Sequence, residues 1–77
     1  MLLLFTTPHC PNCPKAKLLA AEKLPDASLI DASFPEGLNR ARKYNVAQVP
    51  TLLEINEEGS EIRRFSGIDD IVNFIEN

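Results

Sequence analysis

The sequence predicts an α/β fold in which three helices flank a four-stranded mixed sheet. Two observations support this prediction. Short apolar or alternating runs, bounded by turn residues, are interspersed with stretches whose apolar side chains recur at helical spacing, in the order βαβ followed by αββα. A helix separates the first two strands and a tight hairpin joins the last two, so the sheet should contain both parallel and antiparallel pairs.

Composition sets the class of protein. The chain has 77 residues, a net charge of −3, 44% hydrophobic and 25% charged residues, which is typical of one small globular domain spanning residues 1–77. The acidic balance gives no electrostatic case for binding nucleic acid or an anionic membrane. The apolar start, residues 1–5, is too short for a membrane span or a signal peptide. We therefore expect a cytoplasmic protein.

The first strand is expected at residues 2–5, a continuous apolar run of the kind that is buried on both faces of a sheet. The first helix follows, with an apolar stripe that includes Cys13, Ala16 and Ala20. Its start is open. Pro11 suits a first helical position, but Pro14 would then lack the N–H that bonds back to residue 10; alternatively the regular helix starts at Pro14 after a looser turn.

The middle of the chain predicts one strand and one helix. Pro25 and Asp26 end the first helix, and residues 27–31 should form a second strand parallel to the first. Residues 32–37 are expected to be a loop. Residues 38–44 then form a short basic helix whose end is marked by Asn45.

The last third predicts a hairpin and a helix. Residues 52–55 are the third strand, and residues 56–60 are a hairpin loop in which Gly59 can adopt a positive φ. Residues 61–65 alternate polar and apolar side chains, which indicates a half-exposed edge strand. The turn at residues 66–67 leads into an amphipathic helix over residues 68–75.

Charged residues near the end of the chain are expected to have structural roles. Arg63 and Arg64 on the edge strand should discourage pairing with other sheets. Asp69 and Asp70 suit the N-terminal end of the last helix, where carboxylates complement the helix dipole.

The only two cysteines, Cys10 and Cys13, lie three positions apart between the first strand and the first helix. Cys-x-x-Cys at such a junction is a redox signature. A helix N-terminus stabilises the reactive thiolate through free N–H groups and the positive end of the dipole. Cys10, on the outer edge, should be the attacking sulfur, and Cys13, one turn into the helix, the shielded resolving sulfur. Sulfur supplies the chemistry, so no bound cofactor is needed.

Metal binding is the alternative for this pair. Structural zinc requires four ligands, and only His9, the single histidine, could join the two thiolates. Because His9 is directly adjacent to Cys10, it is poorly placed to bind the same ion. A c-type haem is excluded because Pro14 follows Cys13. No metal site is predicted. His9 could instead help to stabilise the Cys10 thiolate when protonated, or be a plain exposed loop residue.

The motif and the order of elements resemble the thioredoxin-like superfamily, in particular its small thioredoxin- and glutaredoxin-like members. The run from Ala41 to Val46, followed by Val49-Pro50-Thr51-Leu52, is similar to the run of helix, tyrosine, valine and Pro-Thr strand in that family. The resemblance implies a cis peptide bond before Pro50. It also implies that the substrate chain docks on the backbone of Val49 as a short added strand.

Pro11 and Asn12, between the cysteines, are also expected to contact the substrate. Two other positions depart from the family pattern. Typical thioredoxins carry a buried acid where this chain has Leu4, and typical glutaredoxins carry a lysine that helps to hold glutathione where it has Thr7. The acid after the glycine turn, at Asp69 or Asp70, could contact glutathione as it does in glutaredoxins.

The resemblance implies a protein-disulfide oxidoreductase. The expected protein is a monomeric dithiol carrier that reduces disulfide-containing protein substrates and is itself reduced by a thioredoxin reductase or by glutathione. Three alternatives stay open: a glutathione-dependent glutaredoxin, a module in which the cysteines bind a metal or an iron–sulfur cluster, and a binding domain in which the cysteine pair is incidental.

Overall fold

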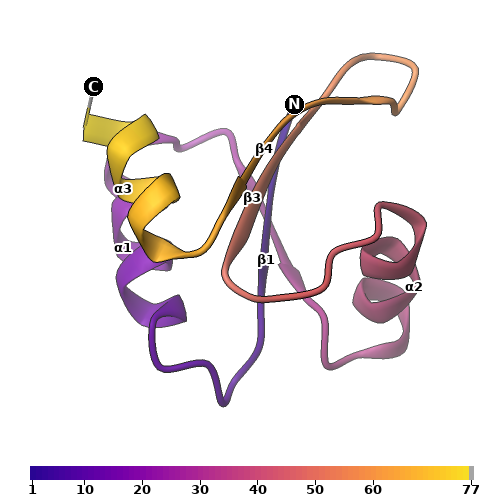
Figure 1. Cartoon of the computed structure of the whole chain (residues 1–77), viewed down its shortest axis with the longest axis horizontal. Coiled ribbons are helices and arrows are strands. Elements are labelled where there is room, and N and C mark those ends of the chain that lie inside the picture. The colour runs from indigo at the N-terminus through magenta and orange to yellow at the C-terminus, as the bar shows by residue number, and fades with distance from the viewer. Residues whose placement is uncertain (77) are drawn as a thin grey trace.

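The computed structural model describes residues 1–76 and arranges them as one mixed sheet with helices on both faces (Figure 1). The strands are β1 (Leu2–Thr6), β2 (Ser28–Asp31), β3 (Thr51–Ile55) and β4 (Glu61–Ser66). The helices are α1 (Cys13–Lys23), α2 (Pro35–Lys43) and α3 (Ile68–Glu76). The order across the sheet is β2-β1-β3-β4, with β1 parallel to β2 and the other two pairs antiparallel. The predicted α/β class and the mixed pairing are confirmed.

Two apolar cores lie on the two faces of the sheet. α1 and α3 cover one face and α2 covers the other (Figure 1). Because successive side chains of a strand point to opposite faces, β1 contributes to both cores. Leu3 and Phe5 pack on the α2 side and Leu4 packs on the α1–α3 side, all three fully buried. The prediction of a first strand buried on both faces is therefore confirmed.

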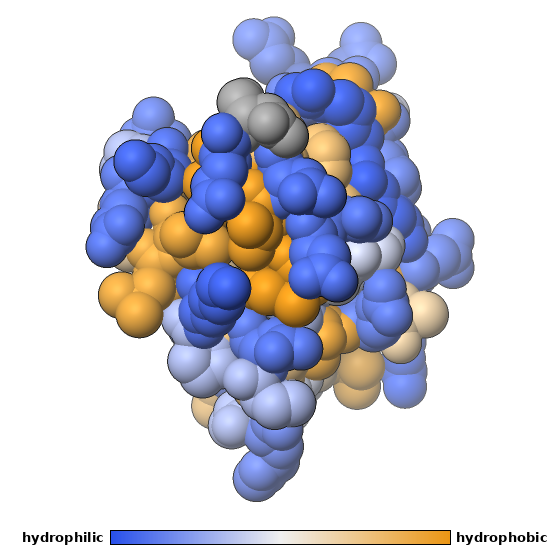
Figure 2. Space-filling model, turned by 60° about the vertical axis from the view of Figure 1, so that its left-hand side comes forward, coloured by the Kyte–Doolittle hydropathy of each residue, from blue (hydrophilic) through white to orange (hydrophobic). Residues whose placement is uncertain are grey.

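The face with α1 and α3 leaves apolar side chains at the surface among charged ones (Figure 2). At the seam between β4 and α3, the rings of Phe65 and Phe74 stack with centroids 4.2 Å apart. The guanidinium of Arg63 lies 5.3 Å from the Phe74 centroid. Stacking and a cation–π contact thus hold the last helix against the edge strand.

The start of α1 is now defined. The helix begins at Cys13 with Pro14 in its first turn, after turns at residues 8–9 and 11–12. Of the two starts left open by the sequence, the later one is thus nearer to the structure. Proline fits there because the first N–H groups of a helix have no partner within the helix.

The prediction of a loop over residues 32–37 is wrong in its second half, because α2 already starts at Pro35. Pro35 occupies a first-turn position, which suits its fixed φ, and Phe34 before it is extended, with φ −94° and ψ 153°. Gly37 lies within this helix, at the point where α2 passes close to β2. A Cβ on this glycine would overlap the carbonyl oxygen of Asp31.

Smaller differences affect the ends of the other elements. β2 starts at residue 28, α2 ends before Tyr44, and Ser66, expected in a turn, is the last residue of β4. Asn45, with φ 55°, follows the end of α2, and Gly59 has φ 83° in the hairpin, both as predicted. None of the helices among residues 1–76 is long and apolar enough to cross a membrane.

Candidate active site

The site lies at the end of the sheet where β1 and β2 finish and β3 begins. Phe5 pairs with Thr51, and Thr6 pairs with Asp31. β4 also ends here, because Ser66 pairs with Thr51. Two of the connections at this end form the candidate site: the Cys turn, defined as residues 7–13, and the docking segment, defined as residues 45–50.

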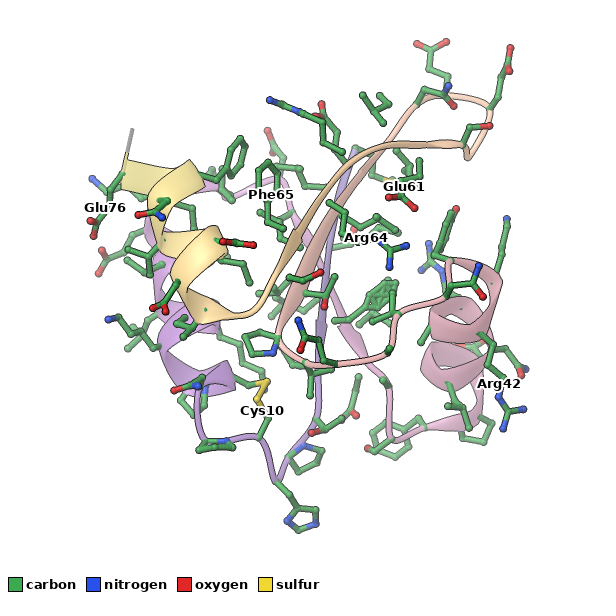
Figure 3. All side chains as sticks on the ribbon, viewed as in Figure 1. Cys10, Arg42, Glu61, Arg64, Phe65 and Glu76 are labelled. Carbon is green, nitrogen blue, oxygen red and sulfur yellow. A yellow bond between two sulfur atoms is a disulfide. The ribbon has the colours of Figure 1, made fainter. Side chains whose placement is uncertain are left out.

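The two cysteines are joined by a disulfide, with Cα atoms 5.3 Å apart. Cys10 lies beside the start of α1 (Figure 3). Its exposed fraction is 8%, against 1% for Cys13. The order of exposure is the one expected if Cys10 meets an incoming disulfide and Cys13 stays shielded.

The Cys turn is held by bonds within itself. The Cys10 N–H donates to the Thr7 carbonyl at 3.3 Å, and the Cys13 N–H donates to the Cys10 carbonyl at 3.4 Å. These bonds set Cys10 in the turn that leads into the helix, two residues before its N-cap Asn12. The hydrogen bonds that bring the two cysteines together are thus local in the chain.

The N-terminal end of α1 keeps its positive polarity. Asn12 occupies the N-cap position without a capping bond from its side chain, and the first turn of the helix contains no acidic residue. No side-chain carboxylate in that turn offsets the partial positive charge of the helix end. Once the disulfide is reduced, this charge favours the thiolate of Cys10 over its thiol.

The docking segment ends at a cis peptide bond between Val49 and Pro50, as the family resemblance implies. Pro50 is fully buried, and its carbonyl accepts the Gly67 N–H at 2.9 Å. The Thr51 hydroxyl donates to the Gln48 carbonyl at 2.7 Å. The backbone before β3 is therefore fixed at the same end of the sheet as the Cys turn.

The remaining predicted residues are placed less specifically. Pro11 and Asn12 are exposed between the cysteines, on the surface next to Cys10. His9 is exposed as well, which agrees with the plain loop reading. Within residues 1–76 no three His, Cys, Asp or Glu side chains lie close enough to hold a metal ion, so His9 does not complete a ligand set with the two cysteines.

Leu4 occupies the position where typical thioredoxins carry a buried acid. It is fully buried in the apolar cluster that includes Ala16 and Ala20 of α1. Cys13 lies on that same buried side of the helix. β1 thus offers no carboxylate to accept the Cys13 proton.

Asp31 lies where β2 ends, at this same end of the sheet. Its Oδ1 accepts hydrogen bonds from the Ser33 hydroxyl at 2.5 Å and from the Ser33 N–H at 2.8 Å. These bonds favour the charged carboxylate and lower the pKa of Asp31 below its ordinary value of 3.8. They fix the turn that leads into α2.

Sequence reasoning missed one residue that contacts the docking segment. Arg64 of β4 donates to the carbonyls of Tyr44 and Asn45, where α2 gives way to this segment. No local sequence pattern indicates this contact, because the two carbonyls lie 19 and 20 residues before Arg64 in the chain. Gly67, which holds the Pro50 carbonyl, was expected only to turn the chain.

Known proteins are similar to this chain in sequence and in fold. The chain is 36% identical to a probable thioredoxin of Archaeoglobus fulgidus over 62 residues, which are 75% of this chain and 67% of that protein. It is 37% identical to a thioredoxin of Methanocaldococcus jannaschii over 65% of this chain and 64% of that protein.

Among solved structures, the crystal structure of oxidised thioredoxin O2 from Arabidopsis thaliana superimposes with a TM-score of 0.72. The two are 26% identical, and the match covers 95% of this chain and 66% of that one. No family model matches the sequence.

Proposed function

The chain belongs to the thioredoxin family and is a thiol–disulfide oxidoreductase, and we propose that it works as a dithiol carrier that reduces disulfides in other proteins. The observation that supports this role most strongly is the Cys10–Cys13 disulfide, in which the more exposed cysteine lies in the turn that leads into a helix N-terminus. The docking segment lies at the same end of the sheet and would align a substrate chain with that sulfur.

In the first step the Cys10 thiolate attacks one sulfur of a substrate disulfide. A new S–S bond joins Cys10 to the substrate, and the other substrate sulfur leaves as a thiolate that takes up a proton. The substrate chain lies along the backbone of Val49 and Pro50, where N–H and C=O groups can pair with it as a short strand. Pro11 and Asn12 contact its far side.

In the second step Cys13 loses its proton and attacks the Cys10 sulfur. The mixed disulfide breaks, the second substrate thiolate leaves, and the Cys10–Cys13 bond forms again. Two electrons have passed from the dithiol to the substrate. Because Leu4 stands where an acid would accept the Cys13 proton, this proton goes to water or to the departing thiolate.

A reductant must return two electrons and two protons to the Cys10–Cys13 pair. A thioredoxin reductase is the proposed donor, because Thr7 replaces the lysine with which typical glutaredoxins hold glutathione. We place the protein in the cytoplasm, where thiols are kept reduced. We propose that it is a monomer. His9 has at most a modulating role, since it is exposed before the first cysteine.

The test is insulin reduction by the wild-type protein. With dithiothreitol as the reductant, it should accelerate insulin precipitation well above dithiothreitol alone; no acceleration would contradict the carrier role. With NADPH as the electron source, thioredoxin reductase should sustain turnover better than glutathione with glutathione reductase. The reverse preference would identify a glutaredoxin instead. Stoichiometric metal in protein purified without chelators, lost on Cys10→Ser, would point to the metal module.

A further inference from the structure

Arg64 reaches from the edge strand β4 toward the end of α2 (Figure 3). Its Nη2 donates to the Tyr44 carbonyl, and its Nη1 donates to the Asn45 carbonyl at 3.0 Å. Glu61 accepts from the other side of the same guanidinium, from Nε at 3.1 Å and from Nη2 at 2.8 Å. Because the guanidinium is a rigid planar fork, these bonds fix both its position and its plane.

The two carbonyls directly follow α2, at its C-cap Tyr44 and at Asn45. The helix ends in a Schellman motif with Asn45 in the left-handed region, at φ 55°. The bonds of that motif run from the Asn45 N–H to the Arg42 carbonyl at 3.2 Å and from the Val46 N–H to the Ala41 carbonyl at 2.8 Å. The carbonyls of Tyr44 and Asn45 lie at this negative end of the helix dipole, where a cation is favoured.

β4 and the glycine that follows it therefore hold the docking segment at both of its ends. Arg64 binds the start of the segment, and the Gly67 N–H binds its last carbonyl, that of Pro50, at 2.9 Å. Between these anchors Val46 and Val49 are partly buried against the core on the α2 side. The intervening residues 47 and 48 are exposed, so they have little packing to hold them.

We propose that Arg64 is a positioning residue for the reaction with protein disulfides. By binding the two carbonyls that follow α2, it holds the docking segment where a bound substrate chain brings its disulfide to Cys10. Arg64 has this role only if Val49 and Pro50 dock the substrate as proposed above. A small disulfide that reaches Cys10 without lying along the segment does not need Arg64.

The test compares two substrates with each variant. Arg64→Gln should lower kcat/KM for insulin about tenfold, mainly by raising KM. This loss is smaller than the roughly hundredfold loss that a 1 Å misplacement of the substrate can cause. The rate at which the reduced variant reacts with the small disulfide 5,5′-dithiobis(2-nitrobenzoate) should stay within about twofold of wild type, because the local turn that sets the Cys10 thiolate is unchanged. Arg64→Lys keeps the charge but loses the planar fork of donors, so its kcat/KM for insulin should lie between those of wild type and Arg64→Gln.

Arg63→Gln is the matched control. Arg63 is the neighbouring arginine on β4, and its guanidinium pairs with Glu54 at 2.6 Å rather than with the docking segment. Its insulin kinetics should match wild type. If Arg64→Gln does not fold, Arg64→Lys is compared with Arg63→Lys in its place.

The outcomes separate the two proposals. Equal losses on both substrates, or an unchanged kcat/KM for insulin in folded Arg64→Gln, overturn the positioning role while the carrier function stands. A wild-type protein that reduces the small disulfide but not insulin overturns the carrier function, and the role of Arg64 falls with it.

Discussion

The Cys turn and the docking segment lie at the same end of the sheet but are held there by different kinds of contact. The hydrogen bonds of the Cys turn join residues three positions apart in the chain. The docking segment has local bonds too, but it is also held from farther along the chain. Arg64 of β4 donates to the carbonyls of Asn45 and of Tyr44 just before the segment, 19 and 20 residues earlier, and the Gly67 N–H donates to the Pro50 carbonyl. Local contacts thus place the sulfur proposed to react, and tertiary contacts help to place the segment proposed to dock the substrate. Changes far from the sulfur should therefore alter substrate use without altering thiol reactivity.

The largest effect is expected within the Cys turn. Cys10→Ser should abolish insulin reduction, because the attacking sulfur is gone. Cys13→Ser should accumulate a mixed disulfide with insulin, because the first step proceeds and the second cannot. The adduct is measured by intact mass under non-reducing conditions. Equal trapping by both variants would contradict the assignment of the two roles.

Pro50→Ala tests the docking segment. The Pro50 ring is fully buried and its carbonyl is bonded to Gly67, so truncation loosens the segment where it enters β3. We expect kcat/KM for insulin to fall by about 10- to 100-fold, as for other small misplacements of bound substrate. The rate with the small disulfide should be preserved.

Pro25→Ala is the control for this change, since Pro25 is an exposed proline in the connection after α1. Its insulin kinetics should match wild type. Wild-type insulin kinetics in folded Pro50→Ala would contradict a docking role for this segment.

Gly37→Ala tests the packing of α2 against β2, on which the docking segment depends. The added methyl group overlaps the Asp31 carbonyl, so α2 must move away from the sheet. We expect the free energy of unfolding to fall by about 1–3 kcal/mol, the usual cost of overpacking. Urea denaturation measures it.

Asn39→Ala, at an exposed position of the same helix, is the control and should change the stability by less than about 0.5 kcal/mol. A Gly37→Ala variant as stable as wild type would show that α2 can shift at no cost.

The smallest effect is expected at Asp31, and it depends on pH. The folded-state pKa of Asp31 lies below the ordinary 3.8, so its ionised form stabilises the fold above pH 3.8. This contribution is lost as the pH falls through the folded-state pKa. Asp31→Asn should therefore lower the Tm at pH 7, with the difference from wild type closing in strong acid. Asp26→Asn is the control, and a difference that persists unchanged in acid would contradict the assignment.

Local patterns predicted most of the fold. The buried run of β1 and the hairpin before β4 follow from short stretches of sequence, and the structure agrees with both. Gly37 misled the prediction, because a glycine after a proline is typical of a loop unless a neighbouring strand requires close approach. That requirement comes from Asp31, whose carbonyl lies against α2 only once the sheet has formed.

The candidate site was predictable to the same degree. The two cysteines carry a local signature, and the sequence indicated both their proximity and their order of exposure. The cis bond before Pro50 followed from family resemblance and not from the residues themselves. For Arg64 the sequence predicted only protection of the sheet edge. The spacing of residues along the chain does not predict that β4 contacts the end of α2.

The near-complete burial of Cys13 bears on how long a client protein stays attached. In the mixed disulfide a free thiol must attack the Cys10–substrate bond from solution, whereas the shielded Cys13 attacks it from a position whose Cα lies 5.3 Å from that of Cys10. An internal attacker at that range has an effective concentration far above that of any thiol in solution. The covalent adduct should therefore be short-lived and insensitive to the thiol content of its surroundings, and alkylating reagents should label the reduced protein at Cys10 first.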